Sequence, residues 1–172
     1  ENVNGLLYRF SGYSGNFEEG TYLDLFIMQA AKKSGKKIAS LEDYKTSMEM
    51  VTKASLPDDE KTKDKTTKKY YPSYDIWEQV ENAYRKGDLD EMDSLQRLTY
   101  TKNFEKYMLI ERNKIMVHNM DSIMKKHIVF TAIGAAHLPG NEGVINLLRS
   151  MGYTVEPVKS EVTKSSIKQM DK

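Results

Sequence analysis

The sequence has 172 residues, of which 39% are hydrophobic and 30% are charged, so it is long enough to form one globular domain with a hydrophobic core. Lys and Arg number 26 and Asp and Glu number 25, and this near balance gives no basic surface of the kind that binds nucleic acid. The absence of cysteine excludes disulfides, thiolate nucleophiles and cysteine-based zinc sites. No apolar run reaches the roughly 18 residues that a transmembrane helix needs.

The first part of the chain is predicted to contain a strand, a helix and a second strand. A short strand is possible at Leu6–Phe10. A helix is predicted from Thr21 to a stop at Gly35, because four apolar residues recur on one helical face. These are Leu23, Phe26, Ile27 and Ala30. The second strand, Ile38–Leu41, is followed directly by Glu42, and this order is typical of a βαβ-like unit.

The middle of the chain is predicted to be helical around a polar insertion. Helices are expected at Asp43–Lys53, Ser73–Arg85 and Asp88–Leu98. The lysine-rich segment 55–72 is predicted to be a solvated surface loop, and a binding patch for an anionic partner is the alternative. The spacing of three apolar residues in the second of these helices predicts that they pack in the core. They are Trp77, Val80 and Tyr84.

A long helix is predicted from Lys102 to about Lys126, with one apolar stripe that contains a polar residue. The stripe consists of Leu109, Asn113, Met116, Met120 and Ile123. Arg112 lies beside Asn113, and a buried polar group without a partner costs on the order of 1–3 kcal/mol. The pair therefore indicates either a functional site or a salt bridge and hydrogen bond that only fix the packing.

The last part of the chain is predicted to contain a strand, a helix and a final strand. The segment Ile128–Ile133 is apolar on both faces, as expected of a central, covered strand. A helix is predicted after Gly143, with a stop at Gly152, followed by a strand at 153–158 and a polar tail at 159–172. We therefore predict a single α/β (α+β) domain over residues 1–158. In this fold, helices cover a small, partly parallel sheet.

Two residues that suggest chemistry, Glu42 and His137, each follow a predicted strand. Ligands of open α/β sheets bind beyond the carboxyl ends of the strands, so the two side chains are predicted to face one crevice. An imidazole and a carboxylate suit a divalent metal or proton transfer. For each residue alone a structural role is the alternative, because one ligand does not define a metal site.

Other residues around this crevice are predicted to contact a substrate. The small residues Gly134, Ala135 and Ala136 leave room for a substrate or an oxyanion near the backbone. Arg112 is predicted to bind a carboxylate or stabilise developing charge, and Asn113 to orient a ligand.

Three blocks of the sequence, in this order and spacing, resemble the TraB/GumN family, which includes the Tiki proteins and is related to the erythromycin esterases. The blocks are "YLDLFIMQAAKKSGKKIASLED", "ERNKIMVHNM" and "FTAIGAAHLPGNEGVINLLRSMGYTVEPV". The resemblance extends over about residues 22–158 and implies a hydrolase-like α/β fold. By the resemblance, His137 corresponds to the histidine of the second G-x-x-H motif. Glu42 corresponds to the acid of "LE", and Arg112 and Asn113 to the "RN" pair.

The family has two G-x-x-H motifs, whereas residues 134–137 form the only one in this sequence. We expect either that the first motif precedes Glu1 in a longer protein or that this protein has lost half of its site. In both cases the chain by itself is expected to be inactive or impaired. Exposed apolar surface would then favour a homo-oligomer.

The resemblance implies a metal-dependent hydrolase of the peptidase type that uses Mn, Co or Zn, with Glu42 and His137 as metal ligands or acid/base groups. Its substrate would be a peptide or another small molecule. The resemblance to this family also implies an extracytoplasmic location, either periplasmic or lipid-anchored. The alternative function is a non-catalytic module that binds a peptide or a partner in the same crevice.

Overall fold

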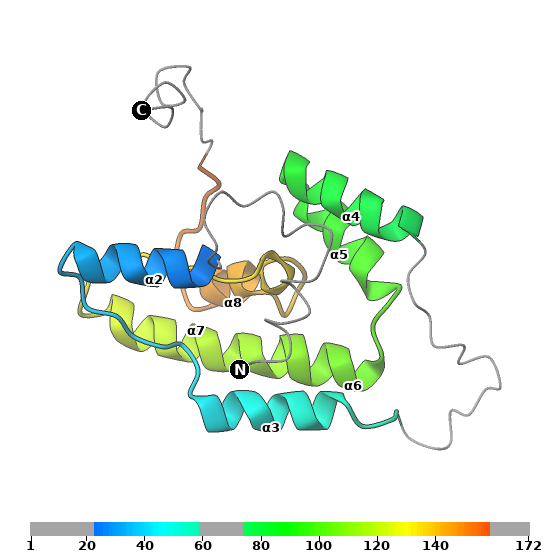
Figure 1. Ribbon diagram of the computed structural model, residues 1–172, viewed down its shortest axis with the longest axis horizontal. Helices are drawn as coiled ribbons and strands as arrows, with labels where there is room; N and C mark the ends of the chain where they lie inside the picture. Colours follow the sequence, from blue (N-terminus) through cyan, green and yellow to red (C-terminus); the bar gives the residue numbers. More distant parts are fainter. Residues whose placement is uncertain (1–22, 59–73, 159–172) are drawn as a thin grey trace. The chain divides into compact units, whose positions relative to one another are not determined.

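The computed structural model describes residues 23–58 and 74–158 (Figure 1). The chain divides into two units, residues 1–40 and residues 41–172, which we describe separately. In the first unit, α2 (Leu23–Lys33) confirms the predicted helix. The turn that follows it contains Gly35, whose φ of 66° lies in the left-handed region that glycine adopts without a steric penalty. The possible strand Leu6–Phe10 lies outside the described residues.

The second unit begins with three helices whose ends are set by side-chain caps or by glycine. They are α3 (Tyr44–Ala54), α4 (Tyr74–Lys86) and α5 (Leu89–Arg97), and all three confirm predicted helices. The carboxylate of Asp43 accepts a hydrogen bond from the backbone N–H of Thr46 at 2.9 Å and caps α3. Asp88 caps α5 in the same way, and Gly87, with a φ of 72°, allows the turn between α4 and α5.

The predicted long helix is present, but it is interrupted by a π-helical segment. It consists of α6 (Lys102–Phe104), the π-helix η3 (Glu105–Ile110) and α7 (Glu111–Met124). The carboxylate of Asp58 accepts hydrogen bonds from the backbone N–H groups of Lys102 and Asn103 at 2.9 and 2.8 Å, which satisfies two donors at the start of α6. The described end of the polar insertion is thereby fixed to the long helix. Residues 59–72 lie outside the described residues.

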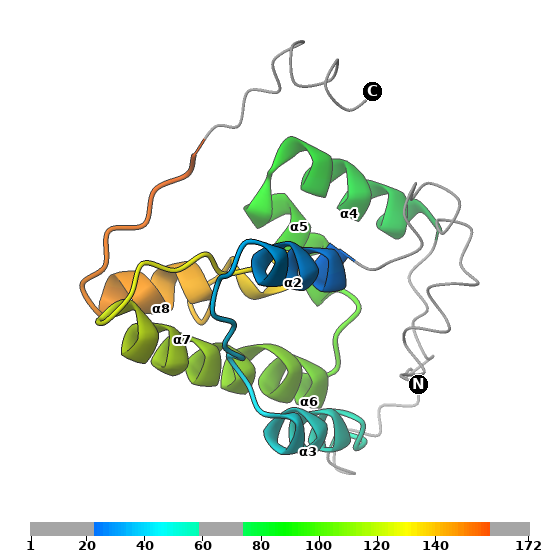
Figure 2. The same ribbon diagram turned by 60° about the vertical axis from the view of Figure 1, so that its left-hand side comes forward.

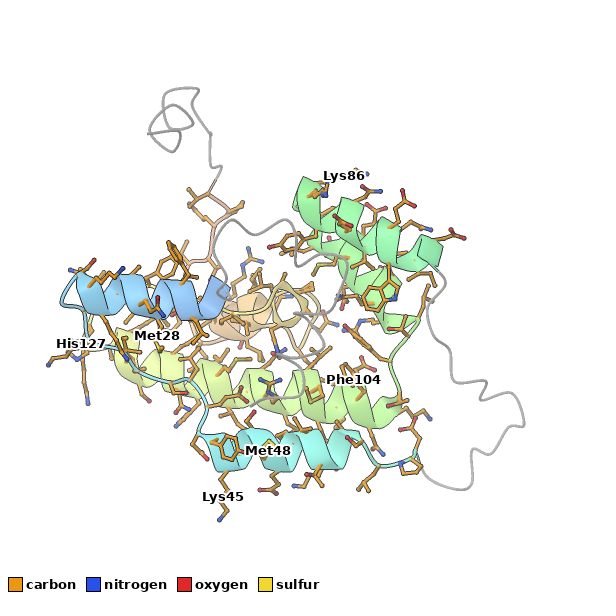
Figure 3. All side chains as sticks on the ribbon, viewed as in Figure 1. Met28, Lys45, Met48, Lys86, Phe104 and His127 are labelled. Atoms are coloured by element: carbon orange, nitrogen blue, oxygen red, sulfur yellow. The ribbon has the colours of Figure 1, made fainter. Side chains whose placement is uncertain are left out.

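The main hydrophobic core of the second unit lies between α7 and α8 (Val144–Ser150), which pack side by side in both ribbon views (Figures 1 and 2). Helix α3 packs against the long helix on another side, and its Lys45 points away from that helix (Figure 3). Partly buried side chains from the extended segments, such as Ile133 and Tyr153, cover the same core. The buried residues of this core are Met116, Val117, Met120, Val144 and Leu148.

A second cluster joins α4 to α5, and it corrects part of the predicted core. Val80 and Ala83 of α4 pack against Met92 of α5. Trp77 and Tyr84, which we expected in the core, are 56% and 63% exposed. The inward face of α4 follows positions 76, 80 and 83, and the two aromatic residues lie at the flank of this face, where their side chains stay exposed.

The predicted small, partly parallel sheet is wrong for the described part of the chain, where no strand is present and the class is mainly α. Neither 38–41 nor 128–133 nor 153–158 is part of a β-ladder. Ile128 and Phe130, expected in a covered strand, are 105% and 83% exposed. A β-branched, apolar run favours extended backbone, but a strand also needs a paired neighbour, and the described residues provide none at these segments.

No helix in residues 23–58 and 74–158 combines the length and the apolar character that crossing a lipid bilayer requires. The polar tail predicted at 159–172 lies outside the described residues.

Candidate functional site

Helix α7 carries the polar residues that organise the candidate site. Arg112 and Asn113 lie in its first turn, immediately after the π-helix η3. Arg112 reaches the bend that precedes α3, whereas Asn113 reaches the loop between the short 3₁₀ turn η4 (Ala135–His137) and α8. The "ERN" sequence therefore connects two loops that are far apart in the sequence.

Arg112 and Glu42 form a two-pronged ion pair. Nη2 of Arg112 donates to Oε2 of Glu42 at 2.7 Å, and Nε donates to Oε1 and Oε2 at 2.9 and 3.1 Å. The two side chains are only 19% and 11% exposed. Water therefore screens the pair weakly, and its parallel hydrogen bonds fix the orientation of the carboxylate. The amide of Asn119 donates to the backbone carbonyl of Leu41 at 2.8 Å and holds the adjoining backbone against α7.

Asn113 joins His137 to the backbone of the following loop. Its Oδ1 lies 2.7 Å from Nδ1 of His137, and its Nδ2 donates to the backbone carbonyl of Glu142 at 2.7 Å. Asn113 is 3% exposed, so both polar atoms of its amide lie away from water and both have a partner. The predicted polar interruption of the apolar stripe is thus a satisfied hydrogen-bonding group.

The environment of His137 favours a neutral imidazole. Burial, reinforced by the positive charge of Arg112, lowers the pKa of His137 from its ordinary 6.5 to about 4, although the negative charge of Glu42 opposes the shift. At neutral pH the ring therefore carries one proton and one nitrogen lone pair. A neutral imidazole is the form that binds a metal or accepts a proton.

The contacts connect the four polar residues that the sequence singled out. Glu42 binds Arg112, Arg112 precedes Asn113 on the same helical turn, and Asn113 binds His137. The charges of Glu42 and Arg112 also act on the imidazole of His137. The other two histidines, His118 and His127, are both exposed.

The small residues before His137 have different surroundings. Gly134 begins the turn, and its carbonyl accepts the backbone N–H of His137 at 3.0 Å. Ala135 is partly buried and packs against the α4–α5 cluster, whereas Ala136 lines a small depression that Asn113 and Pro139 also line. The predicted contact of residues 134–136 with a substrate stays a prediction, and Ala135 has a packing role as well.

The described residues offer one or two ligands for a metal ion, which is fewer than a complete metal site needs. Structural zinc sites have four protein ligands, and catalytic sites have three. No group of three or more His, Cys, Asp or Glu side chains in residues 23–58 and 74–158 is arranged to hold a metal ion. His137 offers a neutral imidazole, whereas both oxygens of Glu42 already accept hydrogen bonds from Arg112.

Sequence reasoning missed the loop that follows His137. The backbone carbonyl of Glu142, which orients Asn113, carries no signal in the type of its side chain. The available signal is the buried Gly143, because a Cβ there would overlap the carbonyl oxygens of Pro139 and Leu138. A glycine that directly precedes a predicted helix was therefore a sign of close backbone packing.

The profile of the TraB/PrgY/gumN family matches residues 8–157 of the chain. Among curated proteins, the chain is similar to "Metalloprotease TIKI homolog" of Nematostella vectensis, with 34% identity over 68 residues. That stretch covers 38% of this chain and 14% of the relative, so the chain spans only a small part of the relative's length. No solved structure shows a significant match.

Proposed function

The chain belongs to the TraB/PrgY/gumN family, and from this premise we propose that it contributes part of the active site of a metal-dependent hydrolase that acts on peptides. The observation that carries the proposal is His137, a half-buried, neutral imidazole held by Asn113 beside the Glu42–Arg112 ion pair. The name of the similar metalloprotease supports the class of reaction. The remaining metal ligands would come from outside the described residues.

The roles of the residues follow from their contacts. His137 would supply one nitrogen ligand, and a divalent ion bound there would polarise a peptide carbonyl and lower the pKa of a water molecule. Glu42 would serve as a metal ligand or as an acid/base group, and its carboxylate is held in place because both of its oxygens accept hydrogen bonds from Arg112. Arg112 would orient that carboxylate, and Asn113 would orient the imidazole.

Substrate contacts are proposed for the turn that carries His137. Ala136, a residue with a small side chain, lines the depression that Asn113 also lines. We propose that a peptide would bind along residues 134–136, which directly precede His137. Mn²⁺, Co²⁺ and Zn²⁺ are the ions we propose, because imidazole and carboxylate groups suit all three.

A metal-binding experiment tests the role of His137 separately from turnover. Co²⁺ binding to the full-length protein is measured by calorimetry for the wild type and for His137→Ala, with His118→Ala as the matched control. We expect His137→Ala to weaken binding at least about tenfold, because one direct ligand is lost. His118 is exposed on α7 and is not part of the site, so the control should bind like the wild type. Equal affinity in the wild type and His137→Ala would overturn the proposal.

A peptidase assay then tests the reaction. The full-length protein is incubated with a peptide mixture and with Mn²⁺, Co²⁺, Zn²⁺ or a chelator, and the products are followed by mass spectrometry. We expect cleavage that needs an added metal and disappears in His137→Ala. Cleavage that persists with the chelator and in His137→Ala refutes the assignment. Peptide binding with no cleavage under any metal supports the non-catalytic module instead.

A further inference from the structure

The amide of Asn113 has only one orientation that its surroundings allow. A backbone carbonyl can only accept hydrogen bonds, so the atom of Asn113 that lies 2.7 Å from the Glu142 oxygen has to be the donor Nδ2. The opposite orientation would place Oδ1 against that carbonyl, with two acceptors in contact at a buried position. The oxygen of the amide therefore faces His137.

The oxygen of Asn113 in turn decides which nitrogen of His137 carries the proton. Oδ1 of an amide accepts and cannot donate, and it lies 2.7 Å from Nδ1 of the ring. Nδ1 has to be the protonated nitrogen for this contact to be a hydrogen bond. The neutral ring then keeps its lone pair on Nε2, for which no hydrogen bond is present among the described residues.

The loop that provides the Glu142 carbonyl is itself tightly constrained. The backbone N–H of Gly143 donates to the carbonyl of Gly140 at 3.0 Å, and Gly140 has a φ of 83°. Gly143 is buried, and any side chain there would overlap the neighbouring carbonyl oxygens. The carbonyl that orients Asn113 thus belongs to a fixed turn rather than to a freely moving loop.

We propose that Asn113 is a positioning residue that holds His137 as the Nδ1–H tautomer and presents Nε2 to the site. The hydrogen-bonded series is the Glu142 carbonyl, the Asn113 amide and the His137 ring. The tautomer assignment needs only these contacts, whereas the use of Nε2 as a metal ligand or proton acceptor rests on the proposed function. An outer hydrogen-bonding group that orients a histidine ligand in this way is a common part of metal sites.

Nuclear magnetic resonance on the metal-free protein tests the tautomer directly. The sequence contains three histidines, so long-range ¹H–¹⁵N spectra of protein labelled with [¹⁵N]histidine give few signals to assign. At pH 8, above the ordinary histidine pKa, we expect a protonated Nδ1 and an unprotonated Nε2 for His137. The exposed His118 and His127 serve as internal references. A protonated Nε2 in wild-type His137 would overturn the proposal without any variant.

Three variants test whether Asn113 causes this state. Asn113→Leu removes the acceptor at similar size, and we expect the His137 signals to change to a mixture of tautomers. Asn113→Asp loses the donor to the Glu142 carbonyl but retains an oxygen that can accept from Nδ1, and we expect the Nδ1–H tautomer to persist. Asn119→Leu is the matched control, because it removes an amide of the same helix that binds the Leu41 carbonyl instead. A pure Nδ1–H tautomer in Asn113→Leu would refute the role of Asn113.

The tautomer measurement and the Co²⁺-binding measurement can fail independently of each other. If His137 has the expected tautomer but His137→Ala binds Co²⁺ like the wild type, the metal role fails while the positioning role stands. If His137→Ala loses Co²⁺ binding but the wild-type ring is protonated at Nε2, the positioning role fails and the metal role stands. Far-ultraviolet circular dichroism of each variant shows whether its helices are retained.

Discussion

Breaking the Arg112–Glu42 ion pair should destabilise the fold far more than breaking a surface pair. In Arg112→Met, the Glu42 carboxylate stays at an 11% exposed position without its guanidinium partner. Removing one partner of a buried pair typically costs about 3–5 kcal/mol. Because water still reaches these side chains in part, we expect a lower cost of about 2–3 kcal/mol.

The double variant Glu42→Gln/Arg112→Met distinguishes the loss of the ion pair from the cost of leaving the Glu42 carboxylate buried without a partner. It leaves no unpaired ion, so we expect it to regain most of the stability that Arg112→Met loses. Urea unfolding of all variants, followed by circular dichroism, should show a midpoint for Arg112→Met that is lower by about 1–2 M, since the slope is about 1–3 kcal/mol/M for small proteins.

The Lys53–Glu49 pair on α3 is the matched control. Its side chains are 40% and 54% exposed, so Glu49→Gln should leave the urea midpoint unchanged. If Arg112→Met shifts the midpoint no more than Glu49→Gln does, then the assignment of Arg112–Glu42 as a buried clamp between α7 and the start of α3 is incorrect.

Three further predictions use the same unfolding measurement. Gly143→Ala places a Cβ against the Pro139 carbonyl, and the forced shift of the backbone should cost about 1–3 kcal/mol. The folded state lowers the pKa of His137 to about 4, so the unfolded chain binds a proton first as the pH falls below 6.5. The free energy of unfolding should therefore be highest above pH 6.5 and should decrease between pH 6.5 and pH 4. The loss is about 3 kcal/mol at 1.36 kcal/mol per pKa unit, and partial exposure of the ring reduces it to roughly 2 kcal/mol. Asp88→Ala removes the cap that accepts the N–H of Glu91 at 3.0 Å and should cost about 1 kcal/mol.

Each of these predictions has a result that contradicts it. An unchanged urea midpoint in Gly143→Ala would show that the loop is loose enough to accept a side chain. For His137, the comparison is His137→Gln, whose stability should vary less between pH 6.5 and 4 than that of the wild type. Equal pH profiles would mean that the imidazole is not held neutral by the fold. Asp88→Asn, which retains a capping oxygen, should behave like the wild type.

The helices could be predicted from the sequence because their determinants are local. Apolar spacing, a capping acid and a glycine stop lie within one or two turns of each other, as at Asp43, Gly87 and Asp88. The predicted strands failed for the opposite reason. The run Ile128–Ile133 has strand-like composition, but a ladder depends on a partner elsewhere in the chain, and no local pattern shows whether that partner is present.

The polar residues of the candidate site were visible for a similarly local reason. Asn113 interrupts an apolar stripe, and a buried amide without partners is too costly to persist, so partners had to exist. Their identity was not visible. The Glu142 carbonyl is a backbone group that every residue has, and only the turn around Gly143 brings it to Asn113.

The sequence by itself thus determined where the helices lie and which of their residues break the apolar pattern, because side-chain spacing and capping act over a few residues. Only the tertiary structure decided which partners those residues have. Glu42 and Arg112 are 70 residues apart, and Asn113 and His137 are 24 apart, so their contacts depend on how helix α7 packs against two distant loops. The burial that keeps His137 neutral is likewise a result of that packing.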